Sequence, residues 1–310
     1  MIKDQKYQLI VLLGPTAVGK TKVAVQLADR MNGEIISADS RQVYRGMNLG
    51  TGKDLGEYQV AGKQITYHLI DNIEAGQVYD VFSFQRDFYK ALDHIEQQGR
   101  LPILCGGTGL YLEAALSARQ LLEVKKNHAL RDELKDESQS ALIKLLKSIN
   151  PELHNTTDLE DRDRLIRAIE IATKKKNTDP LPSPLKNYRI YGLTLERSEL
   201  RERIKKRLDE RLQQGMIEEV EALLKAGIGH ERLDYYGLEY RYIAMYLRRE
   251  LTYQEMYVQL LQAIRRFAKK QMTWYRRMER KGEMIKWFNA EMGSEAISQK
   301  IISDIRSGAI

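Results

Sequence analysis

The segment from Gly14 to Thr21 constrains the fold more than any other part of the chain. It reads Gly-Pro-Thr-Ala-Val-Gly-Lys-Thr, matches the phosphate-loop pattern Gly-x-x-x-x-Gly-Lys-Ser/Thr, and directly follows the apolar run Tyr7–Leu13. Glycines let such a loop curl until successive backbone N–H groups point inward, and the following helix adds the positive end of its dipole. This order of strand, loop and helix predicts a polyphosphate site at the end of a buried strand.

Two kinds of contact are expected from this loop. Lys20 adds a full positive charge, and the hydroxyl of the last residue is placed to bind a magnesium ion, so we expect Mg²⁺ at Thr21. The residues expected to contact the phosphate groups are Gly14, Thr16, Ala17, Val18, Gly19, Lys20 and Thr21.

The charge of the chain is uneven. Between Arg201 and Lys281 there are 19 Lys and Arg residues against 12 Asp and Glu, which accounts for the whole net charge of +7. A basic C-terminal third beside a phosphate loop favours a polyanionic partner larger than a nucleotide. A solvated helical surface that is simply rich in Lys and Arg would give the same count.

Composition also limits the compartment. Cys105 is the single cysteine, so no internal disulfide can form, and a reducing cytoplasm is the expected location. The polar residues 1–6 leave no room for a signal peptide, and no apolar run approaches the length of a membrane span. The five histidines are scattered, so no metal-ligand spacing is present.

The first 120 residues alternate between strand and helix signals, which predicts a parallel sheet with crossover helices. The expected strands are residues 7–13, 34–37, 65–70 and 101–105. The expected helices are residues 19–31, 82–98 and 110–116. The fold class is therefore α/β, a parallel sheet flanked by helices of the kind found in phosphate-loop NTPases.

From about residue 121 the pattern becomes purely helical. Helices are expected at residues 129–137, 139–148 and 159–176, before three prolines form a linker and residues 187–195 return to strand character. This order predicts a helical insertion at 121–186 within a core formed by 1–120 and 187–310.

The C-terminal region is expected to be entirely helical, at residues 198–214, 216–226, 238–250 and 253–281. The last of these helices has an apolar stripe at helical spacing and a basic opposite side. The cations that make it a candidate nucleic-acid surface are Arg266, Lys269, Lys270, Arg276 and Arg277.

Phosphate-loop enzymes usually place an acidic residue at the end of a neighbouring strand. The strand at 101–105 ends in Cys-Gly-Gly-Thr without a carboxylate, whereas Asp39 follows the strand at 34–37 and supplies one. Asp39 could also merely cap a helix. Gly106, Gly107 and Thr108 allow close approach of a ligand to the backbone. Gly50-Thr51-Gly52-Lys53 is either a second ligand loop or a plain turn.

These segments resemble one family, the tRNA dimethylallyltransferases. The motifs that carry the resemblance are the loop Gly14–Thr21, Asp39–Met47, Gly50–Lys53, Gly106–Tyr111, Arg164–Glu170 and Phe267–Arg277. They occur in the right order over roughly residues 7–288. The chain ends soon after the basic helix and has no zinc-finger extension, which indicates a bacterial type of enzyme. It departs from the family at Tyr236–Arg241, where many members carry Gly-Tyr-Lys/Arg-Glu.

The resemblance implies transfer of the dimethylallyl group from dimethylallyl diphosphate to N6 of the adenosine 3′ of the anticodon in tRNA. The phosphate loop would then bind the diphosphate leaving group, with Asp39 as the base and Thr108 and Arg131 assisting catalysis. The anticodon stem-loop would contact Asp39, Ser40, Arg41, Gln42, Asp163, Arg164, Leu165, Ile166 and Arg167, besides the basic helix. A monomer is expected.

Three other functions share parts of this pattern. A small-molecule kinase using ATP would have the same loop, but it gives no reason for the basic C-terminal third. An adenylate isopentenyltransferase would perform the same chemistry on a free nucleotide, against which the basic helix and the insertion argue. A nucleotide-regulated RNA-binding protein would not need Asp39 at all.

Overall fold

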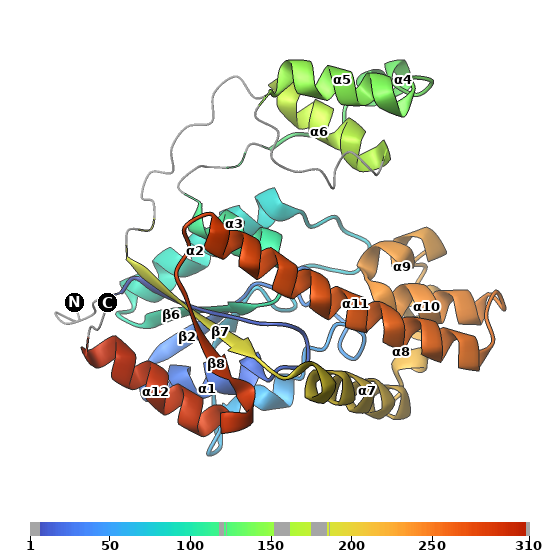
Figure 1. Cartoon of the computed structure of the whole chain (residues 1–310). Coiled ribbons are helices and arrows are strands. Elements are labelled where there is room, and N and C mark those ends of the chain that lie inside the picture. Colours follow the sequence, from blue (N-terminus) through green and yellow to red (C-terminus); the bar gives the residue numbers. More distant parts are fainter. Residues whose placement is uncertain are drawn as a thin grey trace. The chain divides into compact units, whose positions relative to one another are not determined.

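The structure, a computed structural model, describes residues 7–117, 121, 123–151, 162–174, 185 and 187–307 (Figure 1). The chain forms two compact units, which we describe separately. Unit 1 comprises Met1–Ser117 and Leu185–Ile310, and unit 2 comprises Ala118–Pro184. The helical insertion that the sequence predicts spans residues 121–186. Within the described residues, no helix combines the length and apolarity that a membrane span requires.

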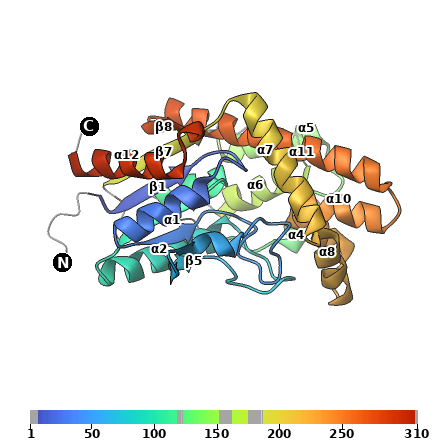
Figure 2. The same cartoon turned by 90° about the horizontal axis from the view of Figure 1, so that it is seen from below.

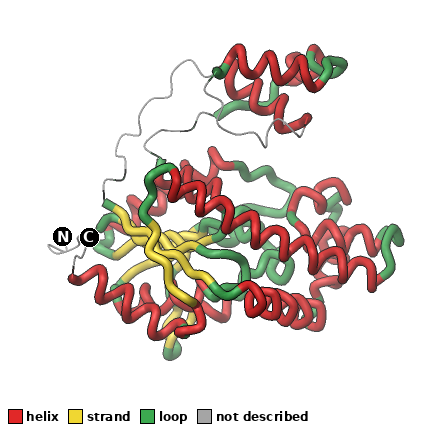
Figure 3. Tube along the Cα trace, viewed as in Figure 1, coloured by secondary structure: helices red, strands yellow, loops and turns green. Residues whose placement is uncertain are grey.

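Unit 1 is built on a six-stranded sheet in the order β5-β2-β6-β1-β7-β8, in which every pair of neighbours is parallel. Figure 3 shows these strands gathered between the helices. The strands are β1 (Leu9–Leu13), β2 (Gly33–Ser37), β5 (Tyr67–His68), β6 (Leu101–Gly106), β7 (Tyr188–Thr194) and β8 (Ile285–Asn289). β3 (Gln59–Val60) and β4 (Lys63–Gln64) form a separate antiparallel pair. The predicted α/β class is confirmed.

Helices cover both faces of the sheet, which explains why β1 is a continuous apolar run. Side chains alternate along a strand, so Ile10 and Leu12 lie on one face of the sheet. Leu9, Val11 and Leu13 lie on the opposite face. The first face carries α1 (Lys20–Arg30) and α12 (Ser294–Ser307), which contact each other (Figure 2). The second face carries α2 (Val81–Gln97), α3 (Gly109–Leu116) and α11 (Tyr253–Arg280).

The helices α7 to α11 follow β7 (Figure 1). They begin with α7 (Arg197–Gln213), α8 (Met216–Lys225), α9 (His230–Tyr236) and α10 (Leu238–Leu247). The expectation of an entirely helical C-terminal region is wrong at residues 285–289, which form the edge strand β8. This short strand pairs on one side only and has a single buried residue, Phe288, so its apolar alternation is weak. Helix α9 was also missed because glycines frame it at 229 and 237.

The described residues of unit 2 form three helices, α4 (His128–Glu133), α5 (Gln139–Ile149) and α6 (Arg162–Lys174). Ser138 caps α5 by accepting a hydrogen bond from the Ala141 N–H, so α4 ends earlier than the predicted residue 137. A small apolar core joins the helices and consists of Leu134, Leu142, Leu146, Leu165, Ile166 and Ile169. The predicted residues 159–161, 175 and 176 of the last helix lie outside the described residues.

Candidate active site

The phosphate loop leaves β1 at Leu13 and turns directly into α1. Gly14 has φ +154°, and a Cβ there would lie 2.7 Å from the Leu193 carbonyl oxygen, so only glycine fits. Ala17 (φ 62°) and Gly19 (φ 96°) are left-handed, and Gly19 is the N-cap of α1. This alternation is typical of an anion-binding nest at a helix N-terminus. The backbone therefore has the conformation expected of a phosphate loop.

Lys20 lies under this loop as a poorly solvated cation. Its Nζ donates to the Pro15 carbonyl oxygen at 2.9 Å. The pKa of Lys20 is lowered to about 8, mainly by burial and also by the charge of Arg207, while the Asp39 carboxylate opposes this shift. Burial also raises the pKa of Cys105 to about 12, so this thiol is neutral and is not a nucleophile. The Lys20 ammonium, held at the loop by this one hydrogen bond, has further N–H groups with which to bind an anion.

The loop after β2 carries Asp39 to the same edge of the sheet, because carboxyl ends of parallel strands meet there. The Arg41 N–H donates to Asp39 Oδ1 at 2.8 Å, which fixes the carboxylate to its own turn. This contact does not cap a helix, since no helix follows within the next ten residues. The charge of this carboxylate opposes the lowering of the Lys20 pKa, so Asp39 lies within electrostatic range of the lysine.

The glycine-rich loop after β6 is bonded to the Asp39 loop. The Thr108 N–H donates to the Ala38 carbonyl oxygen at 3.2 Å, and the Ser40 N–H donates to Thr108 Oγ1 at 3.2 Å. A Cβ at Gly106 would lie only 2.4 Å from the Ala38 carbonyl oxygen, so the two loops could not approach with a larger residue. The structure therefore brings together the predicted residues Asp39, Ser40 and Thr108.

Helix α11 fastens the phosphate loop to the glycine-rich loop, a role that the sequence did not reveal. Gln271 accepts from the Thr16 N–H at 2.9 Å and donates to the Gly107 carbonyl oxygen at 2.9 Å. The Tyr275 hydroxyl lies 3.0 Å from the Gly14 carbonyl oxygen and 3.1 Å from that of Gly107. The signal available was a glutamine four residues before a tyrosine on the buried side of the helix.

The outer side of α11 is basic, as predicted. Of the five predicted cations, those exposed are Arg266, Lys269, Lys270 and Arg276. Arg277 is half-buried: its Nη2 donates to Glu113 Oε2 at 2.7 Å, and its guanidinium lies 4.0 Å from the Trp274 ring centroid. One helix thus combines a loop-binding inner side with a cationic outer side.

A second cation, Arg207 of α7, faces the phosphate loop and was not predicted. It lines a small cavity whose other residues are Thr16, Ala17, Ile204, Leu208, Arg211, Met216, Glu239 and Ile264. Burial lowers the pKa of Arg207 to about 10, and its Nε has no hydrogen-bond partner within the described chain. Its Nη2 lies 3.4 Å from the Asp54 carboxylate. Helix α7 is highly charged throughout, so nothing in its sequence distinguishes this arginine.

The loop Gly50–Lys53 is a structural turn. Glu219 occupies its anion-binding side, accepting from the backbone N–H groups of residues 48, 49 and 50 at 2.7, 2.8 and 3.0 Å. Lys53 is buried and pairs with Asp71. The charge of Lys53 and the backbone N–H groups at the start of this turn are therefore used inside the protein.

The side chains of Arg41 and Gln42 have different surroundings: that of Arg41 covers an exposed ring, and that of Gln42 is bonded inside the fold. The guanidinium of Arg41 lies 4.7 Å from the centroid of Tyr235, a ring that is 39% exposed and also carries Arg232 at 5.1 Å. Gln42 is tied inside the fold, since it accepts from Ser37 Oγ at 3.0 Å and donates to the Gly52 carbonyl oxygen at 3.1 Å. Arg41 is thus the residue of the pair that presents a planar cation beside an exposed aromatic ring.

In unit 2, the predicted residue Arg131 forms an ion pair with Glu170. Its Nε lies 2.8 Å from Glu170 Oε1, and Arg167 Nη1 lies 3.0 Å from Oε2. The side chains of Leu165 and Ile166 belong to the core of this unit, whereas that of Asp163 is 91% exposed. A catalytic role for Arg131 stays a prediction.

Glu170→Gln should destabilise unit 2 by about 3 kcal/mol, because it removes the buried carboxylate that two partly buried arginines share. Burial alone would raise the pKa of Glu170, but hydrogen bonds from Arg131, Asn127 and Arg167 lower it to about 2. Its contribution should therefore be present above the ordinary pKa of 4.5 and be lost as the pH falls towards 2. Hydrogen exchange of α4, α5 and α6 in the full chain measures this; unchanged protection would contradict the role.

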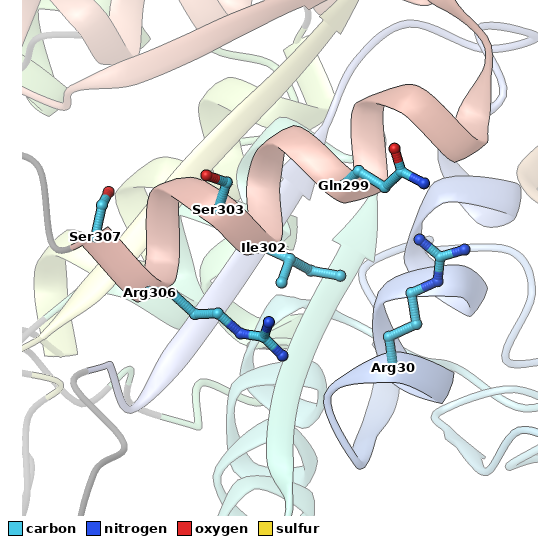
Figure 4. A pocket seen from close by; sticks show the side chains of 6 residues that line it. All are labelled: Arg30, Gln299, Ile302, Ser303, Arg306 and Ser307. Atoms are coloured by element: carbon cyan, nitrogen blue, oxygen red, sulfur yellow. The ribbon is translucent and has the colours of Figure 1, made fainter.

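A larger surface groove of about 790 Å³ lies between α1 and α12 (Figure 4). Its lining residues are Arg30, Gln299, Ile302, Ser303, Arg306 and Ser307. Arg30, at the C-terminal end of α1, is already paired with Glu295. Because the phosphate loop is at the opposite end of α1, this groove is not part of the site.

Several known proteins are similar to this chain in sequence. The model of the IPP transferase family matches residues 42–278. A tRNA dimethylallyltransferase 1 of Geotalea uraniireducens is 51% identical, covering 95% of this chain and 96% of the relative. One from Azobacteroides pseudotrichonymphae is 52% identical, covering 92% and 94%.

Two solved structures are similar as well. The tRNA isopentenylpyrophosphate transferase of Bacillus halodurans has a TM-score of 0.69 at 32% identity, covering 97% of this chain and 98% of that chain. A eukaryotic dimethylallyltransferase acting on tRNA has a TM-score of 0.78 at 23% identity, covering 97% and 80%. At this identity the second likeness concerns the fold alone.

Proposed function

The chain belongs to the IPP transferase family, that of the tRNA dimethylallyltransferases, and we propose that it moves a dimethylallyl group from dimethylallyl diphosphate to N6 of the adenosine 3′ of the anticodon. This proposal rests on one observation: the phosphate loop and an acidic residue lie at the same edge of the sheet. Lys20 and Arg207 flank the loop as cations, and Asp39 lies at the same sheet edge, fixed by its own turn.

In this proposal the two cations bind the leaving diphosphate. Charge grows on the diphosphate as the allylic C–O bond breaks, and cations held in a poorly solvated site stabilise that charge without having to reorganise. Burial lowers the pKa of both Lys20 and Arg207, as expected for cations in a poorly solvated site. The anion that they bind thereby becomes a better leaving group.

The acceptor needs a base, because the N6 lone pair is delocalised into the adenine ring and the amine becomes acidic only as the new bond forms. Asp39 would take that proton. Its Oδ1 accepts from the Arg41 N–H, so the carboxylate is oriented before substrate arrives. Thr108 would hold the Asp39 loop in place through the Ser40 N–H.

We also propose that Mg²⁺ accompanies the diphosphate. The donor set fits a magnesium ion carried by the substrate, since Thr21 offers one hydroxyl in the first turn of α1 and Mg²⁺ takes its other ligands from phosphate oxygens and water. No cluster of three His, Cys, Asp or Glu residues that could hold a metal occurs among the described residues. Bound there, the ion would neutralise diphosphate charge.

The exposed cations of α11 would bind the tRNA backbone, so affinity should fall steeply with salt. Each phosphate contact contributes to the slope of log affinity against log salt, and Lys270→Gln should reduce that slope by about 1. Filter binding of an anticodon stem-loop across a salt series measures it. Lys300→Gln, an exposed lysine on α12, is the matched control. A flat salt response of the unmodified protein would show that the basic side is only solvated.

The base to be modified must leave the anticodon loop stack, which costs less in a single-stranded loop than in a duplex. The Arg41 guanidinium and the Tyr235 ring that it covers are planar groups against which the base could stack. Arg41 belongs to the same turn as Asp39, Ser40 and Gln42. In unit 2 the candidate contacts to the tRNA are Asp163, whose side chain is exposed, Arg164 and Arg167.

The family assignment supports this function over the phosphate-loop kinase. Incubation with labelled dimethylallyl diphosphate or labelled ATP, each with tRNA, separates the two: only the first should leave label on RNA. A monomer stays a prediction, and the buried lone thiol of Cys105 fits a reducing cytoplasm.

A further inference from the structure

The segment that departs from the family pattern places an acid beside the phosphate loop. Gly237 has φ +132° and separates α9 from α10, so that Glu239 falls in the first turn of α10. A Cβ on Gly237 would lie 3.9 Å from Glu239 Oε2 and 4.0 Å from Arg41 Nε. The Glu239 carboxylate and the Arg41 guanidinium, which belongs to the turn that holds Asp39, therefore both lie next to Gly237.

Glu239 lines the same cavity as Thr16 and Ala17 of the phosphate loop. Its carboxylate bonds its own backbone N–H, and no other hydrogen bond or ion pair to it is found in the described part of the chain. The two nearby cations, Arg207 and Arg211, pair with Asp54. Glu239 is thus an acid that faces the anion site without a salt-bridge partner.

The groups around Glu239 shift its pKa in opposite directions. Burial raises its pKa, Arg211 and Arg207 of α7 lower it, and Asp39 of the β2 loop raises it. The phosphate loop contributes the uncharged Thr16 and Ala17, and α8 and α11 contribute only the apolar Met216 and Ile264. A bound diphosphate would add negative charge and raise the pKa of Glu239 further.

An ionised carboxylate would repel diphosphate, whereas a protonated carboxyl group can donate a hydrogen bond to it. We propose that Glu239 binds diphosphate in its protonated form, so that capture of the donor substrate takes up one proton at this residue. The proton stays on the carboxyl oxygen during transfer and returns to solvent when diphosphate leaves. This inference rests on the proposed function, because it assumes that diphosphate occupies the phosphate loop.

Calorimetry with inorganic diphosphate and Mg²⁺ tests the proposal, using wild type and Glu239→Gln in two buffers of different ionisation enthalpy. Glutamine keeps the shape and the donor but cannot titrate. Wild type should take up more protons than the variant, the difference approaching one as the pH rises. Between the raised pKa of Glu239 in the free protein and its still higher pKa in the complex, the wild-type affinity should fall relative to that of the variant by up to tenfold per pH unit.

Comparing two proteins removes the titration of diphosphate and of Lys20, which is common to both. Glu231→Gln, an exposed acid on α9, is the control and should behave as wild type. Equal proton uptake by wild type and Glu239→Gln would overturn the proposal, and so would tighter binding by the variant at every pH, the sign of an ionised Glu239. Failure of wild type to bind diphosphate at all would overturn the proposed function itself.

Discussion

Asp39→Asn should lower the rate of dimethylallyl transfer by about 10²–10⁴-fold while tRNA affinity is retained. Asparagine keeps the Oδ1 acceptor of the Arg41 N–H, a contact of 2.8 Å, so the turn should persist while the base is lost. Single-turnover kinetics with saturating tRNA measure the chemical step directly, and equilibrium binding measures the retained affinity.

Asp39→Ala provides the matched comparison, because it removes both the base and the acceptor. If Asp39 only shapes the turn, asparagine should restore near-normal rates and alanine should not. A single-turnover rate of Asp39→Asn close to that of wild type would therefore remove Asp39 from the role of base. Equal, large losses in both variants support it.

Lys20→Met should weaken binding of dimethylallyl diphosphate by about 10–100-fold, as expected for one charge-assisted hydrogen bond to a diphosphate. Lys22→Met is the control, because this lysine is two residues further along α1, is 63% exposed and pairs weakly with Glu57 at 3.6 Å. Calorimetry gives both affinities. Unchanged binding in Lys20→Met would place the leaving group elsewhere.

The same lysine should make the ligand-free protein less stable at neutral pH. Its pKa is about 8 in the fold against 10.5 in the unfolded chain, so folding releases protons between these values. Stability should rise with pH through that window, and Lys20→Met should not lower the thermal midpoint at neutral pH. This melting measurement separates lost binding from lost folding.

The sequence predicted those parts of the site that local patterns specify. The phosphate loop, the Asp39 turn and the glycines at 106 and 107 each lie at the carboxyl end of a buried strand, and the strand order then brings them to one edge. Ser40 and Thr108 were predicted as separate contacts, and the structure shows that they bond each other. The loops themselves depend on residues close together in sequence, whereas the Ser40–Thr108 bond joins residues 68 positions apart.

The remaining features depend on contacts between distant segments. Gln271 bonds a residue 255 positions away, and Arg207 and Glu239 face the phosphate loop only because α7 and α10 pack beside it. The edge strand β8 is defined by its pairing with β7, and its own residues carry little pattern. Charge-rich helices conceal which of their ionic residues are buried, so α7 gave no sign of Arg207.

Transfer of label to RNA tests the central claim most directly. Purified protein, Mg²⁺ and labelled dimethylallyl diphosphate are incubated with an anticodon stem-loop that carries adenosine 3′ of the anticodon, or with the same stem-loop carrying guanosine there. We predict that label enters the adenosine stem-loop alone and that one diphosphate is released for each label incorporated. No transfer to the adenosine stem-loop, or equal transfer to both, would contradict the function and the site described for this chain.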